Sequence, residues 1–325
     1  MKIFSIVSKL TLASIVLFLA ASCSSNDNKV APAANGDTLS GTITISGAFA
    51  LYPLAVKWGD EFKKLHPNVK FDISAGGAGK GISDALGGLV DIGAVSRDLK
   101  DEEVANGAFP FAVAKDAVVA TFNSKNPNAG EILTKGLSGT ALGNIFATGS
   151  FTNWKQAGFT QSAPINIYTR SDAAGAGEVW AKYFGKKQED LLGTGVFGDP
   201  GLVSAVQNDV DGIGYNNISY AYDPNTKKQL ANISVVPIDI NNNGTIDADE
   251  NFYGTLDQLL TAIGNDKYPS PPARQLYFIT KNKPTNKVVI AFLQWVLTDG
   301  QKFVSENGYV QLPQAKLDEG KNKLN

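Results

Sequence analysis

The amino-acid sequence predicts an α/β fold of two lobes, in which each lobe has a mostly parallel sheet flanked by helices. Three observations lead to this class. The chain has 325 residues, which is longer than one typical domain. Strand-like alternation and helix-like spacing follow each other repeatedly along the chain. Apolar residues make up 43% of the chain and charged residues 18%, a balance typical of a soluble globular protein with a sizeable core.

The first unit of the predicted fold has a β-α-β-α-β order. Thr-Ile-Thr-Ile at 42–45 alternates polar and apolar side chains as a strand does, and Gly47 ends it. Pro53 suits the first turn of the helix that follows. The predicted elements, in order, are a strand at 42–45, a helix at 53–65, a strand at 69–73, a short helix at 82–89 and a strand at 90–95. Such alternation is typical of parallel strands covered by helices.

A second unit of the same kind follows. Its predicted elements are strands at 117–122, 165–169, 213–216 and 233–238 and a helix at 177–184. Towards the C-terminus, apolar residues at helical spacing between 288 and 303 predict one long helix. The last residues, 320–325, are expected to form a frayed tail.

Composition excludes several classes of function. A formal net charge of −2 argues against nucleic acid as a partner, because binding to the phosphate backbone requires a basic surface. A single cysteine excludes an internal disulfide and a zinc site with several thiolates, and a single histidine disfavours catalytic triads. The candidate acid–base carboxylates are Asp172, Glu178 and Asp199. Their spacing in the sequence does not indicate that any two of them form a catalytic pair. We therefore expect a protein that is not an enzyme.

The first 22 residues predict an export signal. Lys2 and Lys9 come before an uncharged apolar run at 10–19. This run is too short to span a membrane comfortably. Small residues then lead to Cys23, an arrangement that resembles a bacterial lipobox, in which the cysteine is lipid-modified and begins the mature protein. We expect a lipid anchor on Cys23 that holds the exported protein at the membrane of the cell envelope, followed by a flexible tether at 23–39. The alternative is a plain secretory signal that contains a cysteine.

A glycine-rich segment at 74–81 precedes a predicted helix. It is not a nucleotide P-loop, because Ser74 and Gly81 stand where that motif needs glycine and Ser or Thr. Glycines nevertheless allow several backbone N–H groups to face one anion at a helix N-terminus, and the alternative is a tight turn without a ligand. Arg97 and Arg170 each follow the C-terminal end of a predicted strand, where ligands bind in open α/β sheets. Together these features favour an oxyanion site over a surface salt bridge.

Five short segments carry a family resemblance. They are Ser46-Gly-Ala48 followed by Pro53 and Lys57-Trp58, Gly77-Ala78-Gly79-Lys80-Gly81, Val90-Asp91-Ile-Gly-Ala94, Arg170-Ser-Asp172-Ala-Ala174-Gly175-Ala176 and Asp211-Gly-Ile-Gly-Tyr215. Their order and spacing resemble the phosphate-binding protein of bacterial phosphate ABC importers over nearly the whole chain from about residue 40. The resemblance implies a two-lobed periplasmic-binding-protein fold of the class II type, a phosphate ligand and an ABC permease as partner.

The resemblance also implies a ligand site between the lobes. The expected ligand-binding residues are Ala48, Phe49, Ala50, Ala78, Gly79, Ser96, Arg97, Arg170, Asp172, Ala174, Gly175 and Ala176. The chain departs from the family where alanine replaces hydroxyl residues, at Ala78, Ala174 and Ala176, and where Ser96 replaces the aspartate that accepts the ligand's proton. The side chains that could restore lost bonds are Ser46, Ser74, Ser96, Arg97, Ser171, Tyr215 and Asn216. The expected ligand is an inorganic oxyanion, with phosphate as the first candidate and sulfate, molybdate or tungstate as alternatives.

In the family, the chain starts in one lobe, crosses to the other and returns. The resemblance therefore places lobe 1 at 40–118 and 272–325, and lobe 2 at 119–271. Ligand binding would close a hinge, and a monomer in this closed form would be recognised by the permease. The alternative role is a calcium-stabilised surface lipoprotein without transport function.

Residues 239–250 match the twelve-residue calcium loop of EF-hands. The expected Ca²⁺ ligands are Asp239, Asn241, Asn243, Thr245 through its carbonyl oxygen, Asp247 and, through both carboxylate oxygens, Glu250. A predicted strand precedes this loop and a helical pattern follows it, so we expect a structural site rather than a paired sensor. The alternative is an Asn-Gly turn in an acidic loop.

Overall fold

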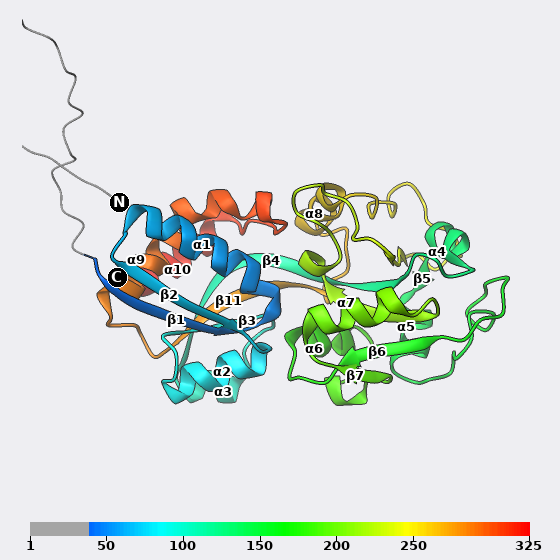
Figure 1. Ribbon diagram of the computed structural model, residues 1–325, viewed down its shortest axis with the longest axis horizontal. Coiled ribbons are helices and arrows are strands. Elements are labelled where there is room, and N and C mark those ends of the chain that lie inside the picture. The colour runs from blue at the N-terminus through cyan, green and yellow to red at the C-terminus, as the bar shows by residue number, and fades with distance from the viewer. Residues whose placement is uncertain (1–38) are drawn as a thin grey trace, which may run out of the picture. The chain divides into compact units, whose positions relative to one another are not determined.

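The computed structural model describes residues 39–325, whose elements surround two hydrophobic cores joined by long strands (Figure 1). The first core is built from residues at 43–114 and 276–324, and the second from residues at 117–273. We call the parts around these cores lobe 1 and lobe 2. The predicted signal segment at 1–22, Cys23 and all of the predicted tether except Leu39 lie outside the described residues.

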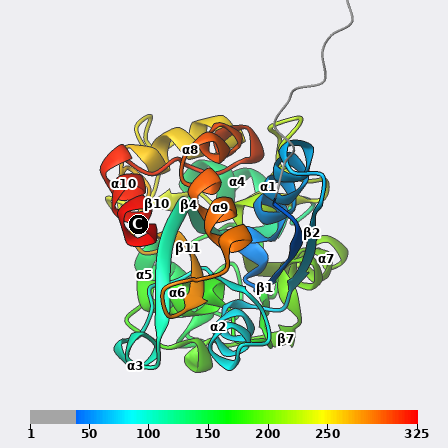
Figure 2. The ribbon, with the colours of Figure 1, turned by 90° about the vertical axis from the view of Figure 1, so that its left-hand side faces the viewer.

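Lobe 1 has a mixed sheet with the strand order β2-β1-β3-β11-β4. Its elements are β1 (Gly41–Gly47), η1 (Phe49–Leu51), α1 (Tyr52–Leu65), β2 (Val69–Ala75), α2 (Ala78–Gly87), β3 (Ile92–Val95), α3 (Asp101–Ala105), β4 (Ala108–Asn123), β11 (Ala273–Lys281), α9 (Lys287–Val296), η4 (Asp299–Phe303), η5 (Ser305–Asn307) and α10 (Gln314–Leu324). β1 is parallel to β2 and β3, whereas β11 runs antiparallel to β3 and β4. Helices α1, α9 and α10 cover one face and α2 covers the other (Figure 2).

Lobe 2 continues the same sheet through β8, β6 and β7. Its elements are α4 (Ala129–Lys135), β5 (Leu137–Ser138), α5 (Gly139–Phe146), β6 (Asn166–Arg170), α6 (Gly175–Tyr183), η2 (Gln188–Asp190), β7 (Thr194–Val196), α7 (Gly198–Asn208), β8 (Gly212–Asn217), η3 (Ile218–Tyr220), β9 (Ile233–Val235), β10 (Ile238–Asp239) and α8 (Leu256–Gly264). β6 is parallel to β7 and β8, and the short strands β5 and β10 form a separate parallel pair.

Strand β4 belongs to both lobes. Its first part, Ala108–Ala117, pairs with β11, and its second part, Val118–Phe122, pairs with β8. The predicted strand at 117–122 is therefore the second half of a longer strand. The first half also forms a strand because Phe111, Val113 and Ala114 are fully buried. β4 and β11 are thus the connections at which one lobe can bend relative to the other.

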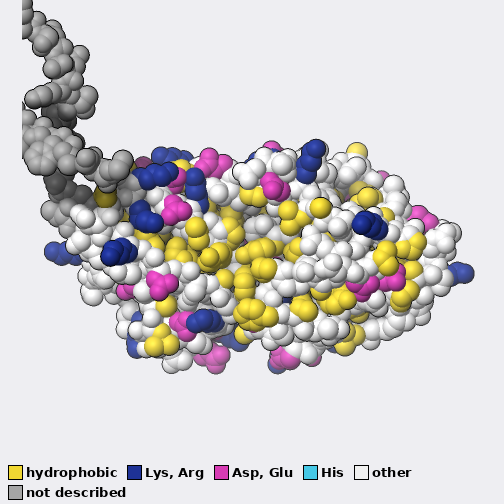
Figure 3. All heavy atoms as spheres, in the orientation of Figure 1, with side chains coloured by type: hydrophobic (Ala, Val, Ile, Leu, Met, Phe, Trp, Pro, Cys, Tyr) yellow, Lys and Arg dark blue, Asp and Glu magenta, His cyan; other side chains and the backbone are white. Residues whose placement is uncertain are grey.

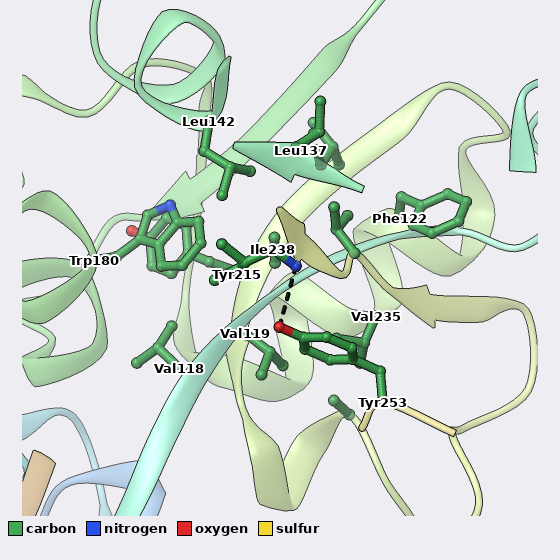
Figure 4. Packing of buried hydrophobic residues seen from close by; sticks show 14 of the residues in the cluster. Val118, Val119, Phe122, Leu137, Leu142, Trp180, Tyr215, Val235, Ile238 and Tyr253 are labelled. Carbon is green, nitrogen blue, oxygen red and sulfur yellow. Dashed lines mark hydrogen bonds between the residues drawn. The ribbon is translucent and has the colours of Figure 1, made fainter. Parts of the chain in front are cut away.

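Each lobe is held by aromatic packing on its own sheet. In α1, Leu54, Trp58 and Phe62 recur every four residues and bury one helix face. The Trp58 indole N–H donates to the Gly300 carbonyl at 2.8 Å, so this large side chain is buried without an unsatisfied donor. In lobe 2, Trp180 stacks on Tyr215 with ring centroids 5.9 Å apart (Figure 4).

The C-terminal segment differs from the prediction. The long helix expected at 288–303 ends at Val296 and is followed by the turns of η4, which bring Gly300 against Trp58. The tail expected to be frayed is the last part of α10. That helix is ordered because Leu317 and Leu324 are buried in the core of lobe 1. Within residues 39–325, none of the helices has the length and apolar character needed to cross a bilayer.

Candidate functional site

Four loops meet where the lobes face each other, and they contain the predicted ligand-binding residues. Three of these loops follow β1, β2 and β3 of lobe 1, and the fourth joins β6 to α6 of lobe 2. The Gly47 carbonyl accepts from the N–H groups of Gly76 and Gly77 at 2.9 and 3.1 Å, and Ala48 N–H donates to Ala94 at 2.9 Å. The carboxyl ends of adjacent parallel strands therefore form one rim, as the sequence predicted.

Small residues are required within the lobe 1 rim. A Cβ on Gly81 would lie 2.5 Å from the Ala94 carbonyl and 2.9 Å from the Gly47 Cα, distances that real side chains do not adopt. Gly77 has a φ of +92° at the N-cap of α2, a conformation that favours glycine. The glycine-rich segment thus has a packing role, because it lets α2 lie close to the strand ends.

The two lobes touch directly at these loops. Gly79 N–H in the first turn of α2 donates to the Ala173 carbonyl in lobe 2 at 3.0 Å. Gly175 at the start of α6 lies against Ser96, and a Cβ at this glycine would come within 2.6 Å of the Ser96 carbonyl oxygen. The N-terminal turns of α2 and α6 are therefore close together. Both present first-turn N–H groups that have no acceptor within their own helix.

Arg170 is the buried cation of the site. Its side chain is 1% exposed, and it ends β6. Its Nε and Nη2 donate to the Asp172 carboxylate at 2.7 and 2.5 Å, and its Nη1 donates to Asp199 at 2.6 Å. Burial alone would lower the pKa of Arg170, but the charges of Asp199 and Asp172 outweigh burial and raise that pKa above its ordinary value. Arg170 therefore stays charged at every physiological pH.

Phe49 covers the guanidinium. The centre of Arg170's guanidinium lies 5.1 Å from the Phe49 ring centroid, a cation–π contact between the lobes. Phe49 also packs edge-on against Phe197 of lobe 2 at 5.7 Å, and its carbonyl accepts from the Tyr220 hydroxyl at 3.3 Å. On the face shown in Figure 3, hydrophobic side chains gather across the middle of the molecule.

Arg97 occupies a different position from Arg170. Its Nη1 and Nη2 bind both oxygens of Glu103 in lobe 1 at 2.8 and 2.7 Å, and its Nε donates to Glu178 in lobe 2 at 2.9 Å. The pKa of Glu103 is lowered because the bonds with Arg97 outweigh the effect of burial. In this conformation Arg97 joins the lobes, and three of its five N–H groups are taken by carboxylates.

The remaining predicted residues are buried alanines. Ala48, Ala50, Ala78, Ala174 and Ala176 are all at most 2% exposed. Three of the side chains considered as replacements for lost hydroxyls bond within the protein, since Ser46 donates to Asp84 at 2.7 Å, Tyr215 pairs with Thr169 at 2.8 Å and Asn216 accepts from Thr121 at 2.9 Å. The candidate anion-binding groups that do not depend on these side chains are therefore the backbone N–H groups and Arg170.

A cavity of about 770 Å³ opens beside the β6–α6 loop. Residues 169–173 line it together with Lys182, Lys186 and Lys187 of lobe 2 and Lys100 of lobe 1. Glu178 and Glu189 lie at the same cavity, so its charge is mixed. The lysines contribute positive charge beside Arg170.

Asp199 is the site residue that its position in the sequence does not reveal. The sequence indicates it only as a potential acid–base carboxylate, whereas in the structure it is completely buried and bonded to Arg170. Asp199 lies in the first turn of α7, which is where a carboxylate is favoured by the helix dipole. The sequence could have indicated such a partner only in general terms, because a buried arginine requires a carboxylate as its counter-charge.

The predicted calcium loop lies apart from this site, between β10 and α8. Asp239 and Glu250 are each 4% exposed. Asp239 accepts from the N–H groups of Asn243 and Gly244 at 3.1 and 2.8 Å, and Glu250 accepts from those of Ile240 and Asn241 at 2.9 and 3.1 Å. Within residues 39–325, no three His, Cys, Asp or Glu side chains gather as a metal-binding group. The loop's oxygen atoms come from carboxylates, amides and the backbone together.

The loop is held against lobe 2 from both ends. β10 pairs with β5, and the Tyr253 hydroxyl oxygen accepts the Ile238 N–H at 3.1 Å (Figure 4). In the middle of the loop, Ile246 N–H donates to the Thr134 carbonyl at 2.8 Å. The last turn of α4 therefore supports the middle of the loop.

Comparison with known proteins agrees with this geometry. A family model described as the PBP superfamily domain matches residues 32–300. The phosphate-binding protein PstS of Methanocaldococcus jannaschii is 29% identical over 343 residues, which cover 87% of this chain and 85% of that protein. The phosphate-binding protein PstS of Pseudomonas aeruginosa is 28% identical over 310 residues, which cover 86% of each.

A solved structure gives the same result. The crystal structure of a phosphate ABC transporter substrate-binding protein from Clostridium perfringens, with bound phosphate, superimposes with a TM-score of 0.69 at 26% identity. The match covers 84% of this chain and all of that one. These relatives are named as binding proteins rather than enzymes. The family model spans most of the described residues, and the two-lobed α/β fold fits it, so the chain belongs to the PBP superfamily.

Proposed function

We propose that this protein is the solute-binding component of an ABC importer and captures an inorganic oxyanion, phosphate first, between its lobes. The observation that carries the proposal is the buried, charged Arg170 beside the N-terminal turns of α2 and α6. Support also comes from relatives named as phosphate-binding proteins and from a similar structure with bound phosphate.

The available donors are sufficient for tight binding. A micromolar dissociation constant corresponds to about −8 kcal/mol, and a hydrogen bond to a charged group contributes roughly 1.5–3 kcal/mol. Asp172 and Asp199 take three of the five N–H groups of Arg170, which leaves two for a ligand. The first-turn N–H groups of α6 at Gly175 and Ala176 do not depend on side-chain hydroxyls. Alanine at 174 and 176 therefore keeps these backbone donors.

Ligand entry requires the lobes to separate. In the structure, Gly79 bonds to Ala173 and Gly175 lies on Ser96, so the loops that would hold an anion are in contact with each other. An anion would enter between the separated lobes and become the bridge between the two helix N-termini, and closure would restore the Gly175–Ser96 contact beside it. Closure around it would then give the loaded form that a permease recognises.

We further propose that the protein is exported, lipid-anchored through Cys23 and monomeric. The apolar run at 10–19 supports export, and the small residues before Cys23 support the anchor. Metabolic labelling with a radioactive fatty acid tests the anchor. Label should enter the wild-type chain and not Cys23→Ser, and equal labelling of both would contradict it.

The loop 239–250 is proposed as a structural Ca²⁺ site. Asp239 and Glu250 are buried, and within residues 39–325 neither of them nor Asp247 forms an ion pair with a basic side chain. Buried carboxylates are costly unless a cation or hydrogen bonds compensate them. The six expected ligands supply oxygens of the kind and spacing that Ca²⁺ prefers.

Calorimetric titration of the purified full-length chain identifies the anion. Phosphate, sulfate, molybdate and tungstate are compared, with and without a chelator. We expect saturable binding of phosphate with one site per chain. If another oxyanion binds tightly and phosphate does not, the ligand assignment is wrong but the solute-binding role stands. If none of the four anions binds, the proposed function is overturned.

A further inference from the structure

A continuous line of buried polar side chains connects the hinge strands to Arg170. It begins with Asp116 on β4 and Arg274 on β11, passes through Asn217 and Asp199, and ends at Arg170. Each of the five residues is at most 7% exposed. Such a buried network is not explained by anion binding alone, because its far end is in the hinge.

The hinge end is an ion pair between the two connecting strands. Asp116 and Arg274 are directly opposite in the antiparallel register of β4 and β11. Arg274 Nε donates to Asp116 Oδ1 at 2.9 Å, and its Nη2 lies 3.3 Å from Oδ2. The pair lies one rung before β4 leaves β11 and begins to pair with β8 of lobe 2. Bending between the lobes therefore changes the surroundings of this pair.

Asn217 connects this pair to lobe 2. Its side-chain oxygen accepts a hydrogen bond from Arg274 Nη2. Its Nδ2 donates to Asp199 Oδ2 at 2.7 Å, and its backbone N–H donates to Asp199 Oδ1 at 2.9 Å. Asp199 Oδ2 also accepts from Arg170 Nη1. Asn217 is thus bonded on one side to a hinge arginine and on the other to the carboxylate that orients the site arginine.

Charge makes these bonds interdependent. Together with Asp172, the line holds three carboxylates and two guanidiniums, all desolvated. In such surroundings the loss of one partner leaves its neighbour with an uncompensated charge, so neighbouring bonds must adjust together.

We propose that Asn217 and Asp199 are positioning residues that couple the angle of the hinge to the orientation of Arg170. Arg274 moves with β11 and lobe 1, whereas Asn217 and Asp199 belong to β8 and α7 of lobe 2. Opening the lobes either breaks the Arg274–Asn217 bond or pulls Asn217 away from Asp199. Arg170 is then held in the orientation seen here only in the closed form. The effect on ligand affinity rests on the proposed function, whereas the effect on the hinge does not.

The test compares two buried asparagines of lobe 2. Asn217→Ala removes the link, and Asn128→Ala is the matched control, because Asn128 is also 1% exposed and its side chain bonds only to the Gln161 backbone in the same lobe. Small-angle X-ray scattering of the full-length chain reports lobe separation, and calorimetry with inorganic phosphate reports affinity. We expect Asn217→Ala to be more open without ligand and to bind phosphate at least ten-fold more weakly. Asn128→Ala should lower only the unfolding temperature.

A double-variant cycle separates coupling from simple destabilisation. Arg274→Lys and Asp199→Asn change groups that share Asn217 as a bonding partner, so coupling predicts that their effects on the phosphate dissociation constant are non-additive by five-fold or more. The same cycle in the Asn217→Ala background should be additive. Additive effects in the wild-type background, or scattering and affinity of Asn217→Ala equal to those of Asn128→Ala, would overturn the proposal. If wild type binds none of the four oxyanions, the proposed function fails, and the scattering of the unliganded variants still decides the hinge coupling.

Discussion

The guanidinium of Arg97 in lobe 1 donates to the carboxylate of Glu178 in lobe 2, with 2.9 Å between Nε and Oε1. Glu103 binds the other edge of the same guanidinium through both oxygens and holds it in lobe 1. The bond to Glu178 can therefore exist only when the lobes are close together. It stabilises a closed form without any contribution from a ligand.

Removing this bond should favour the open form. Glu178 is 30% exposed, so Glu178→Gln should cost the closed form only about 0.5–1 kcal/mol, which corresponds to a two- to five-fold weaker anion affinity. Calorimetry at low and high salt measures the effect, which should shrink as salt increases. Glu189→Gln removes a carboxylate that is 71% exposed and serves as the control. Equal affinities of wild type and Glu178→Gln at low salt would count against a closing role.

Adding a methyl group at Gly175 should prevent full closure. A Cβ there would lie 2.6 Å from the Ser96 carbonyl oxygen, whereas at Gly201 in α7 the nearest atom would be 3.9 Å away. Gly175→Ala should therefore weaken anion binding by ten-fold or more with little change in folding stability. Gly201→Ala should leave binding unchanged and stabilise α7 by about 0.5–1 kcal/mol. Unchanged affinity of Gly175→Ala would show that the loops do not come this close in the bound state.

The pair of Glu103 with Arg97 should make stability depend on pH. The pKa of Glu103 is lowered from 4.5, so the folded state favours the charged carboxylate. The resulting stabilisation is fully present above pH 4.5 and is lost as the pH falls through the lowered pKa. Urea unfolding at several pH values should therefore show wild type to be more stable than Glu103→Gln at pH 7, with a difference that shrinks below pH 4.5. If the difference in unfolding free energy between wild type and Glu103→Gln stays constant down to pH 3, the ionised Glu103 carboxylate is not its cause.

Calcium should stabilise the fold through loop 239–250. Adding CaCl₂ to chelator-treated protein should raise the unfolding temperature measured by calorimetry, because an ion that binds only the folded state stabilises it. Glu250→Gln should abolish most of this shift. Asp249→Asn is the control, because it removes a neighbouring exposed carboxylate that is not an expected ligand. This variant should show the same calcium-dependent rise in unfolding temperature as wild type. The same shift in wild type and Glu250→Gln would argue against calcium binding by this loop.

Site features that are formed by residues close together in the sequence could be predicted. Arg170 could be placed at the site because a strand end followed by small residues and a helix is a local pattern, and β6 and α6 form as that pattern indicates. A glycine-rich turn into a helix could be predicted for the same reason, but α2 begins at Ala78, inside the segment expected to be a loop before a helix at 82–89. The two cores divide the described residues near the crossings that the family topology implies.

Partners that are distant in the chain could not be predicted. Asp199 follows Arg170 by 29 residues, and Glu178 follows Arg97 by 81. No local periodicity specifies such pairs, since they result from how α6 and α7 pack on the sheet. The continuation of β4 through both lobes was missed because its first half ends in the charged pair Lys115-Asp116, and only the tertiary fold shows that Arg274 compensates Asp116. The use of Arg97 as a bridge between lobes, rather than as a group open to a ligand, likewise depends on Glu103 and Glu178.

Calorimetric titration of inorganic phosphate into wild type and Arg170→Met tests the central claim most directly. Lys70→Met, which removes an exposed lysine on β2, controls for the change in net charge. We expect wild type and Lys70→Met to bind one phosphate per chain with the same affinity. Arg170→Met should bind phosphate at least a hundred-fold more weakly while its circular-dichroism spectrum stays that of the folded protein. Undiminished phosphate binding by a folded Arg170→Met would contradict the account.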